Sequence, residues 1–274
     1  MRTLQDAIEK MDDKARCSLK KHLGAAGITS WEDIARSALY DFRDHLEESV
    51  SPGSAKTICA WVKSLFHRYQ DEVSLPAGWE AILQVKGDTT RGTYLTPDEL
   101  KRLEGVEVKS AVERIVLTEA LIEAYTGARI SDVQNFGEEN FSGDYLTYTS
   151  QKTKVTATVP VSEKTKGWIA YAQQHRDDEP TLMSRNRILR RLCQRAGIDS
   201  PVKTRRGGVE KVTPKWEAIS SHSFRKSCAT NLVEAGASLN DAKIALGHTT
   251  TQMTERYVCS SRPNLSGKAM AYFL

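Results

Sequence analysis

The chain has 274 residues, more than one domain usually needs, so we expect two domains that each bury a core. Its formal net charge of +4 is too small to indicate a nucleic-acid partner by itself, and its five cysteines lack CxxC spacing, which argues against a disulfide framework or a thiolate zinc site. The N-terminus carries no apolar leader and no stretch is apolar enough to span a bilayer, so we expect a soluble protein of a reducing cytoplasm.

Residues 1–86 are predicted to form a helical domain. Its clearest helix lies in the run SAKTICAWVKSLFHRYQDE, residues 54–72, where apolar side chains recur at helical spacing. These positions are expected to be core: Ile58, Trp61, Val62, Leu65, Phe66 and Tyr69. Lys56 and Lys63 lie off this stripe. They could contact a DNA backbone, although ordinary solvated surface positions would look the same.

Residues 87–94 are polar, contain glycine and lack an apolar period, which predicts an interdomain linker. A second domain is predicted over residues 95–258. It begins with a capping box, because Thr96 is followed by a proline and then by Glu99. A buried helix follows and ends at Gly127, which places Arg129 just beyond a helix end. The segments DYLTYTS and VTATVP alternate like two strands, so their hairpin would carry Lys152 or Lys154 at its tip.

After this hairpin the chain is predicted to be helical again, except for a polar loop from about residue 199 to residue 218. Helices are expected in HSFRKSCATNLVEAG, in SLNDAKIALG between a serine cap and a glycine, and in TTQMTERYV. The predicted fold class is therefore mainly α (α+β), a helical domain followed by a helical body with one small antiparallel sheet. Residues 259–274 are expected to form a tail that docks on a neighbouring protomer or, alternatively, on its own domain.

A run of basic residues extends from residue 185 to residue 215, with two acidic residues in that span. A solvated basic surface with a loop is the simpler interpretation. Contact with phosphates becomes the better one because candidate catalytic residues flank the run. Together with Lys56 and Lys63, the candidate DNA-contacting residues are Arg187, Arg190, Arg191, Lys203, Arg205 and Arg206.

The residue types near the C-terminus fit cleavage of a phosphodiester. Such an enzyme must cancel charge on the non-bridging oxygens, activate a nucleophile and protonate the leaving oxygen. We see no cluster of carboxylates for metal ions, whereas two guanidinium groups can bind the phosphate oxygens. A phenol can attack phosphorus and form a covalent intermediate, and a lysine can act as general acid. The candidate catalytic residues are Arg129, Lys152, His222, Arg225, His248 and Tyr257.

The order and spacing of these residues resemble the tyrosine recombinase (phage integrase) family. TGARISDV is similar to the family's first arginine box, QKTKVTATVP to its lysine hairpin, HSFRKS to its HxxR motif, and LGHTTTQMTERY to its histidine-to-tyrosine segment. The resemblance implies that Tyr257 is the nucleophile and that residues 1–86 are a core-binding domain. It also implies that Asp132 supports the site without touching DNA. Lys154 competes with Lys152 as general acid, and Lys226 replaces a frequent histidine.

The resemblance further implies a site-specific recombinase that forms a 3′-phosphotyrosyl link and a Holliday junction, as a homotetramer on two duplex DNA sites, without a metal, ATP or other cofactor. Its setting would be the nucleoid of a bacterial or archaeal cell, or a mobile element. Two alternatives are a type IB topoisomerase, which relaxes DNA by the same chemistry, and an inactive architectural DNA-binding protein. The target sequence stays open, as does whether Tyr257 acts in its own subunit or in a neighbour's.

Overall fold

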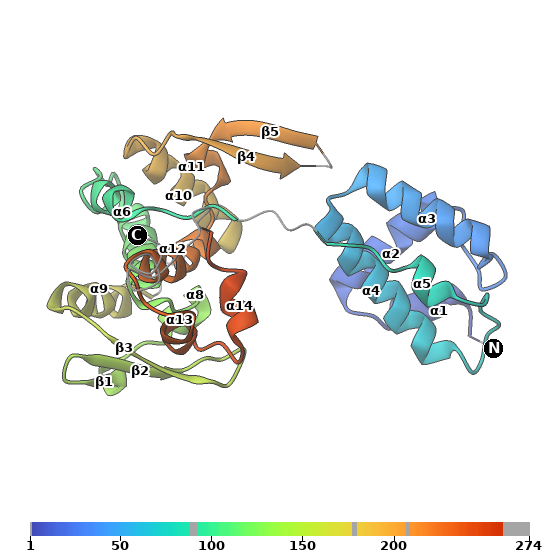
Figure 1. The fold of residues 1–274 in the computed structure, drawn as a ribbon, viewed down its shortest axis with the longest axis horizontal. Coiled ribbons are helices and arrows are strands. Elements are labelled where there is room, and N and C mark those ends of the chain that lie inside the picture. The colour runs from blue at the N-terminus through green and yellow to red at the C-terminus, as the bar shows by residue number, and fades with distance from the viewer. Residues whose placement is uncertain (1, 88–91, 177–179, 207–208, 260–274) are drawn as a thin grey trace, which may run out of the picture. The chain divides into compact units, whose positions relative to one another are not determined.

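The computed structural model describes residues 2–87, 92–176, 180–206 and 209–259 (Figure 1). The chain divides into two compact units. The first comprises Met1–Thr90 with Lys203–Lys211, and the second comprises Arg91–Val202 with Val212–Leu274. Each unit has its own hydrophobic core. The predicted C-terminal tail lies outside the described residues, except for Cys259.

The described residues of the first unit are mainly helical, as the sequence predicts. The helices are α1 (Leu4–Glu9), α2 (Asp13–Ala25), α3 (Arg36–Ser49), α4 (Pro52–Tyr69) and α5 (Trp79–Ile82). Ser51 caps α4 and Pro52 occupies its first turn, an arrangement that satisfies an N–H group and fixes the helical φ. The apolar stripe of α4 is buried, apart from the half-buried Trp61, so the stripe is core as predicted.

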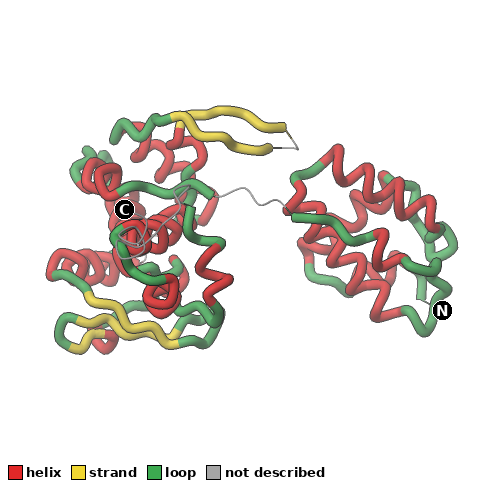
Figure 2. Tube along the Cα trace, viewed as in Figure 1, coloured by secondary structure: helices red, strands yellow, loops and turns green. Residues whose placement is uncertain are grey.

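The second unit is a helical body built around α7, and Figure 2 shows its helices in red. Its helices are α6 (Pro97–Glu104), α7 (Ala111–Thr126), α8 (Ile130–Val133), the 3₁₀ helix η1 (Glu138–Asn140), α9 (Glu163–Gln174), α10 (Leu182–Arg195), α11 (Lys215–Ala218), α12 (Ser221–Glu234), α13 (Leu239–Leu246) and α14 (Thr251–Glu255). α7 packs against α9, α10 and α12 and is buried on most of its circumference. No helix in the described ranges is both long and apolar enough to cross a membrane.

A three-stranded antiparallel sheet lies in the second unit, with the order β1 (Phe141–Ser142), β2 (Tyr145–Thr149) and β3 (Thr156–Pro160). In its register Tyr148 is opposite Ala157 and Thr149 is opposite Thr156. Leu146, Tyr148 and Ala157 point into the core while alternate residues are exposed, which is the period-two pattern seen in the sequence. The predicted hairpin is therefore confirmed, and residues 150–155 form its turn.

The predicted polar loop over residues 199–218 is wrong. This stretch forms two strands, β4 (Pro201–Arg206) and β5 (Val209–Pro214), which pair as a second sheet and lead into α11 (Figure 1). The physical reason is local: Gly207-Gly208 stands between two segments that are able to pair, which is a recognised hairpin signal. The described residues thus contain two small sheets where one was predicted.

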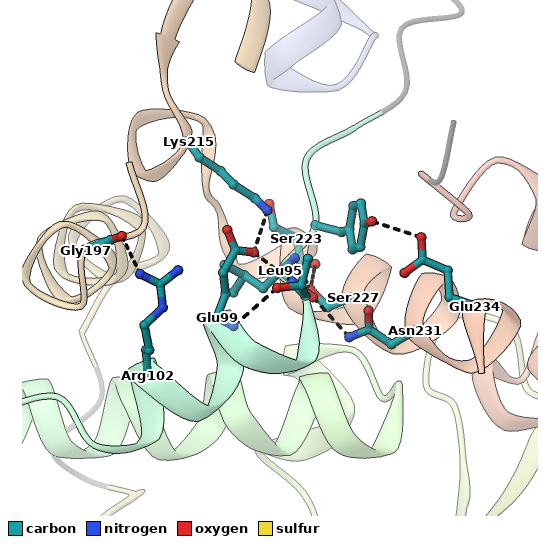
Figure 3. Close-up of polar contacts among 11 residues, drawn as sticks. Leu95, Glu99, Arg102, Gly197, Lys215, Ser223, Ser227, Asn231 and Glu234 are labelled. Carbon is teal, nitrogen blue, oxygen red and sulfur yellow. Dashed lines mark hydrogen bonds and ion pairs between the residues drawn. The ribbon is translucent and has the colours of Figure 1, made fainter. Parts of the chain in front are cut away.

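The entry of the chain into the second unit is fastened to α12, the helix that carries the HxxR motif (Figure 3). The Leu95 N–H donates to Ser227 Oγ at 2.8 Å, and Asn231 Nδ2 donates to the Leu95 carbonyl at 3.0 Å. Nearby, Lys215 Nζ donates to Glu99 Oε2 at 2.5 Å in a buried ion pair. Since Glu99 also belongs to the capping box of α6, these contacts join α6, α11 and α12 into one rigid frame.

Candidate active site

Arg225 lies at the centre of the site and is fully buried. Its Nη1 donates to the Gly127 carbonyl, and its Nη2 donates to the Leu246 carbonyl at 2.6 Å. Within the described residues, its Nε has no hydrogen-bond partner. Burial, and then the charge of Arg129, lowers the pKa of the guanidinium, although arginine stays protonated in proteins. Two backbone carbonyls thus hold a fixed cation, and its Nε–H and the second hydrogen of each Nη are left to bind a ligand.

Gly127 allows this arrangement because it ends α7 in the left-handed region, at φ 71°. A Cβ at this position would lie 3.1 Å from Cys228 Sγ and 3.4 Å from Leu246 Cγ. The close approach of α7 to α12 and α13 therefore depends on glycine both for its backbone conformation and for space.

Arg129 follows this turn and begins α8. Its Nη1 donates to Ser150 Oγ at 2.8 Å and lies 4.0 Å from Asp132 Oδ2. The other oxygen of Asp132 accepts the Gln151 N–H at 2.9 Å. The buried Asp132 carboxylate therefore links Arg129 to the β2–β3 turn, the geometry expected of a supporting residue.

His248 follows Gly247, which ends α13 at φ 60°. The imidazole is buried, and its Nδ1 shares a hydrogen bond of 3.0 Å with Thr254 Oγ1. Its Nε2 meets no hydrogen-bonding atom of the described residues. Burial, followed by the charges of Arg225 and Arg129, lowers the pKa of His248 to about 4. A neutral imidazole with one open nitrogen results.

His222 occupies the second position of α12, one turn before Arg225. Loss of water, and then the charges of Lys226, Arg225, Arg129 and Lys152, lowers the pKa of His222 to about 4. The exposed imidazole is therefore neutral near pH 7.

Tyr257 stands just beyond α14 and packs against both imidazoles. Its ring centroid is 4.9 Å from that of His222 and 4.7 Å from that of His248, with tilted or edge-on planes. Arg225 Cζ lies 5.5 Å from the same centroid. The hydroxyl of Thr230 donates to the Tyr257 carbonyl at 3.3 Å. The phenol is therefore held beside the guanidinium and the histidines of its own chain.

The turn between β2 and β3 carries both candidate lysines, and both are exposed. The charge of Lys152 acts on the His222 pKa, which places this lysine within electrostatic reach of the site. Lys154 has a left-handed φ of 56°. Thr153 between them donates to the Gly247 carbonyl at 3.4 Å, so the turn is tied to the segment that holds His248.

The candidate DNA-contacting residues fall in different environments. Lys56 and Lys63 line a groove of about 510 Å³ in the first unit together with Lys86, so three ammonium groups surround one hollow. Arg187, Arg191 and Lys203 are exposed, while the side chains of Arg205 and Arg206 lie outside the described part. Arg190 is half-buried, and its Nε donates to the Ile219 carbonyl at 3.1 Å, so it also fixes the backbone ahead of α12.

Several cations of the basic run are bound inside the protein. Arg185 pairs with Glu119, Arg195 with Glu113, and Lys215 with Glu99. In the sequence this run looks like one basic surface, since charge counts do not show which charges meet a buried carboxylate. The supporting hydroxyls of Ser150, Thr230 and Thr254 have no sequence signal and could not be predicted.

Comparison with known proteins places this geometry in a family. The model of the phage integrase family matches residues 93–262. The fold, the site and this match define an enzyme class, the tyrosine-type site-specific recombinases. Since the match covers more than half of the 274 residues, the chain belongs to the phage integrase family.

Among curated relatives, the chain is similar to the tyrosine recombinase XerD of Chlamydia pneumoniae, with 26% identity over 281 residues that cover 94% of this chain and 87% of the relative. It is also similar to the tyrosine recombinase XerA of Pyrococcus furiosus, with 27% identity over 180 residues, 60% of this chain and 56% of the relative. The fold matches a lambda integrase(75-356) dimer bound to a COC′ core site, with a TM-score of 0.67 and 16% identity. The match covers 96% of this chain and 97% of the lambda integrase chain. It also matches the Tn1549 transposon integrase in complex with transposon right end DNA, with a TM-score of 0.66 and 15% identity. This match covers 100% of this chain and 99% of the Tn1549 integrase chain.

Proposed function

We propose that this protein cleaves and rejoins duplex DNA at specific sites through a 3′-phosphotyrosyl intermediate on Tyr257, with exchange through a Holliday junction. The observation that carries the proposal is the packing of the Tyr257 ring against His222 and His248, with Arg225 5.5 Å from its centroid. A phenol in this position can act as nucleophile toward a phosphate bound by the guanidinium.

In the proposed reaction, the phenol oxygen of Tyr257 attacks phosphorus and forms a new P–O bond while the bond to the 5′ oxygen breaks. A neutral imidazole beside the ring accepts the phenol's proton, and Lys152 Nζ gives a proton to the departing 5′ oxygen. Arg129 and Arg225 bind the non-bridging oxygens and offset the developing charge. Religation runs the same steps in reverse, with a 5′ hydroxyl as the nucleophile.

We propose that the reaction requires neither a metal ion nor ATP. The charge that a metal supplies in other phosphoryl transfers comes here from two guanidinium groups, one of which is fixed by backbone carbonyls before any substrate binds. The phosphotyrosyl bond conserves the energy of the phosphodiester, so resealing needs no further input.

The position of Tyr257 supports cleavage within the same subunit. The phenol contacts His222 and His248 of its own chain, so no residue of a second protomer is required to complete the set. Delivery to a neighbour would require these ring contacts to break first.

Double-stranded DNA is the proposed partner, and a homotetramer on two synapsed sites is the proposed assembly. The lambda integrase neighbours include a tetramer bound to a Holliday junction (TM-score 0.64, 16% identity). We propose that residues 1–86 form a core-binding domain, joined by residues 87–94 to a catalytic domain over 95–258. The lysine-lined groove of the first unit and the exposed arginines of α10 would contact phosphates, which predicts binding that weakens steeply with salt.

The test uses nicked suicide duplexes made from DNA that flanks the gene, in which a short cleaved strand diffuses away and traps the covalent adduct. We expect an adduct with the wild-type protein and none with Tyr257→Phe. Tyr145→Phe is the matched control because this tyrosine is 53% exposed on β2, so its adduct should form as in the wild type. Adduct formation by Tyr257→Phe would refute the assignment, and DNA binding without any adduct would favour an architectural protein.

A further inference from the structure

Three carboxyl groups of α7 are buried, and two of them are almost completely inaccessible. Glu119 and Glu123 are one turn apart and are only 1% and 2% exposed. Burying a carboxylate costs several kcal/mol unless it is paired or hydrogen-bonded, so both need an explanation. Glu119 has one, since it forms an ion pair with Arg185 of α10. Glu123 makes a different contact.

Glu123 is bonded to the first turn of the helix that carries the site. Ser221 Oγ donates to Glu123 Oε2 at 2.7 Å, and both groups are buried. The Ser221 N–H donates to Asn186 Oδ1 of α10 at 2.9 Å. Ser221 is therefore bound twice, by a side chain of α7 through its hydroxyl and by a side chain of α10 through its backbone N–H.

These two hydrogen bonds add to a cap at the start of α12. There the Ser220 N–H donates to Ser223 Oγ at 3.1 Å, as in a capping box. The residue after Ser221 is His222, and Arg225 follows one turn later, so the start of α12 sets the position of both.

We propose that Glu123 is a positioning residue, which orients His222 and Arg225 toward the scissile phosphate by holding Ser221 at the start of α12. This inference rests on the proposed function. Glu123 is only 2% exposed, so its carboxyl contacts no substrate. The proposed effect passes through the Ser221 hydrogen bond, so the removal of either partner should misplace the imidazole.

The test compares Glu123→Leu, which fills a similar volume without an acceptor, with Ser221→Ala, which removes the donor. Each should slow single-turnover adduct formation about tenfold, since small misplacements of catalytic groups are costly, while DNA affinity stays within twofold. The double variant should be no slower than either single variant, because both remove one interaction. Ser227→Ala is the matched control: this buried serine of α12 binds the Leu95 N–H, so its loss should lower stability without slowing cleavage.

A second measurement needs no DNA. The imidazole NMR signals of His222, one of six histidines, should shift in Glu123→Leu and in Ser221→Ala but not in Ser227→Ala. Unchanged His222 signals would overturn the inference, as would wild-type cleavage rates in both variants. If the wild type formed no adduct while His222 still shifted, the proposed function would fail and the structural link would stand.

Discussion

The buried carboxyl of Glu123 should make the stability of this protein fall as pH rises. Burial is the main cause that raises its pKa from 4.5 to about 8, the charge of Glu119 adds to this, and the Ser221 hydrogen bond and the charges of Arg185 and Arg225 oppose it. Between pH 4.5 and 8 the folded protein therefore holds a proton that the unfolded chain has lost. The contribution of Glu123 to stability is largest below pH 4.5 and declines until Glu123 ionises in the folded state.

Replacement of Glu123 by glutamine removes this dependence while it keeps an oxygen that can accept from Ser221. A pKa rise from 4.5 to about 8 corresponds to about 5 kcal/mol. Relaxation and water entry reduce such penalties, so we expect about half of that value. For a domain of this size, this is a gain in Tm of about 5–10 °C at pH 8.5 over wild type.

Calorimetry of both proteins at pH 5, 6.5 and 8.5 provides the measurement, because other titrating groups cancel in the difference between them. The Tm of Glu123→Gln should match that of wild type at pH 5 and exceed it increasingly toward pH 8.5. A constant Tm difference across this range would refute the reasoning, since it would show that Glu123 does not titrate between these pH values.

Three further outcomes are expected. Arg225→Lys keeps a positive charge but loses the two guanidinium hydrogen bonds to backbone carbonyls, so adduct formation should slow about 100-fold or more in single-turnover assays. An unchanged rate would contradict the role proposed for the guanidinium group. Lys152→Ala should lose cleavage of ordinary DNA yet cut a duplex with sulfur in the bridging 5′ position, because a thiolate leaves without a proton; rescue seen in Lys154→Ala instead would move the general acid to that residue. The pKa of His248 is about 4 in the folded protein and 6.5 in a free imidazole, so its contribution to stability should fall as pH drops from 6.5 toward 4. In chemical denaturation, the free energy of unfolding of His248→Gln should therefore depend less on pH over this range than that of wild type.

Local signals were sufficient to predict most of the fold. The capping box at Thr96 and Glu99, the serine cap at Ser238 and the glycines at 127 and 247 all mark helix ends that the structure contains. Such signals work because each depends on residues within one turn of the helix end. The same holds for the β2–β3 hairpin, where side chains alternate between the core and solvent.

The second hairpin was missed although its turn signal, Gly207-Gly208, is present in the sequence. Both strands are rich in charged residues, and Val209 and Val212 are 68% and 60% exposed, so no buried face produces an apolar alternation. A strand without a buried face leaves no hydrophobic period, and only its turn chemistry could have predicted it.

The candidate catalytic residues could be named from order and spacing, whereas their supports could not. Nothing in the sequence connects Glu123 to Ser221, which are 98 positions apart, or shows that Arg185 meets a carboxylate and not solvent. These contacts depend on how α7, α10 and α12 pack in the tertiary structure, which local sequence patterns do not specify.

Thr230 has a mechanical consequence for the end of the chain. Its buried hydroxyl donates to the Tyr257 carbonyl at 3.3 Å and accepts the Cys259 N–H at 3.0 Å. The backbone is thus clamped to α12 on both sides of Val258, directly after the phenol. A force applied to the chain after Cys259 would therefore act on α12 through Thr230 before it could displace Tyr257. One threonine thus keeps the position of the reactive side chain independent of movement in the chain that follows.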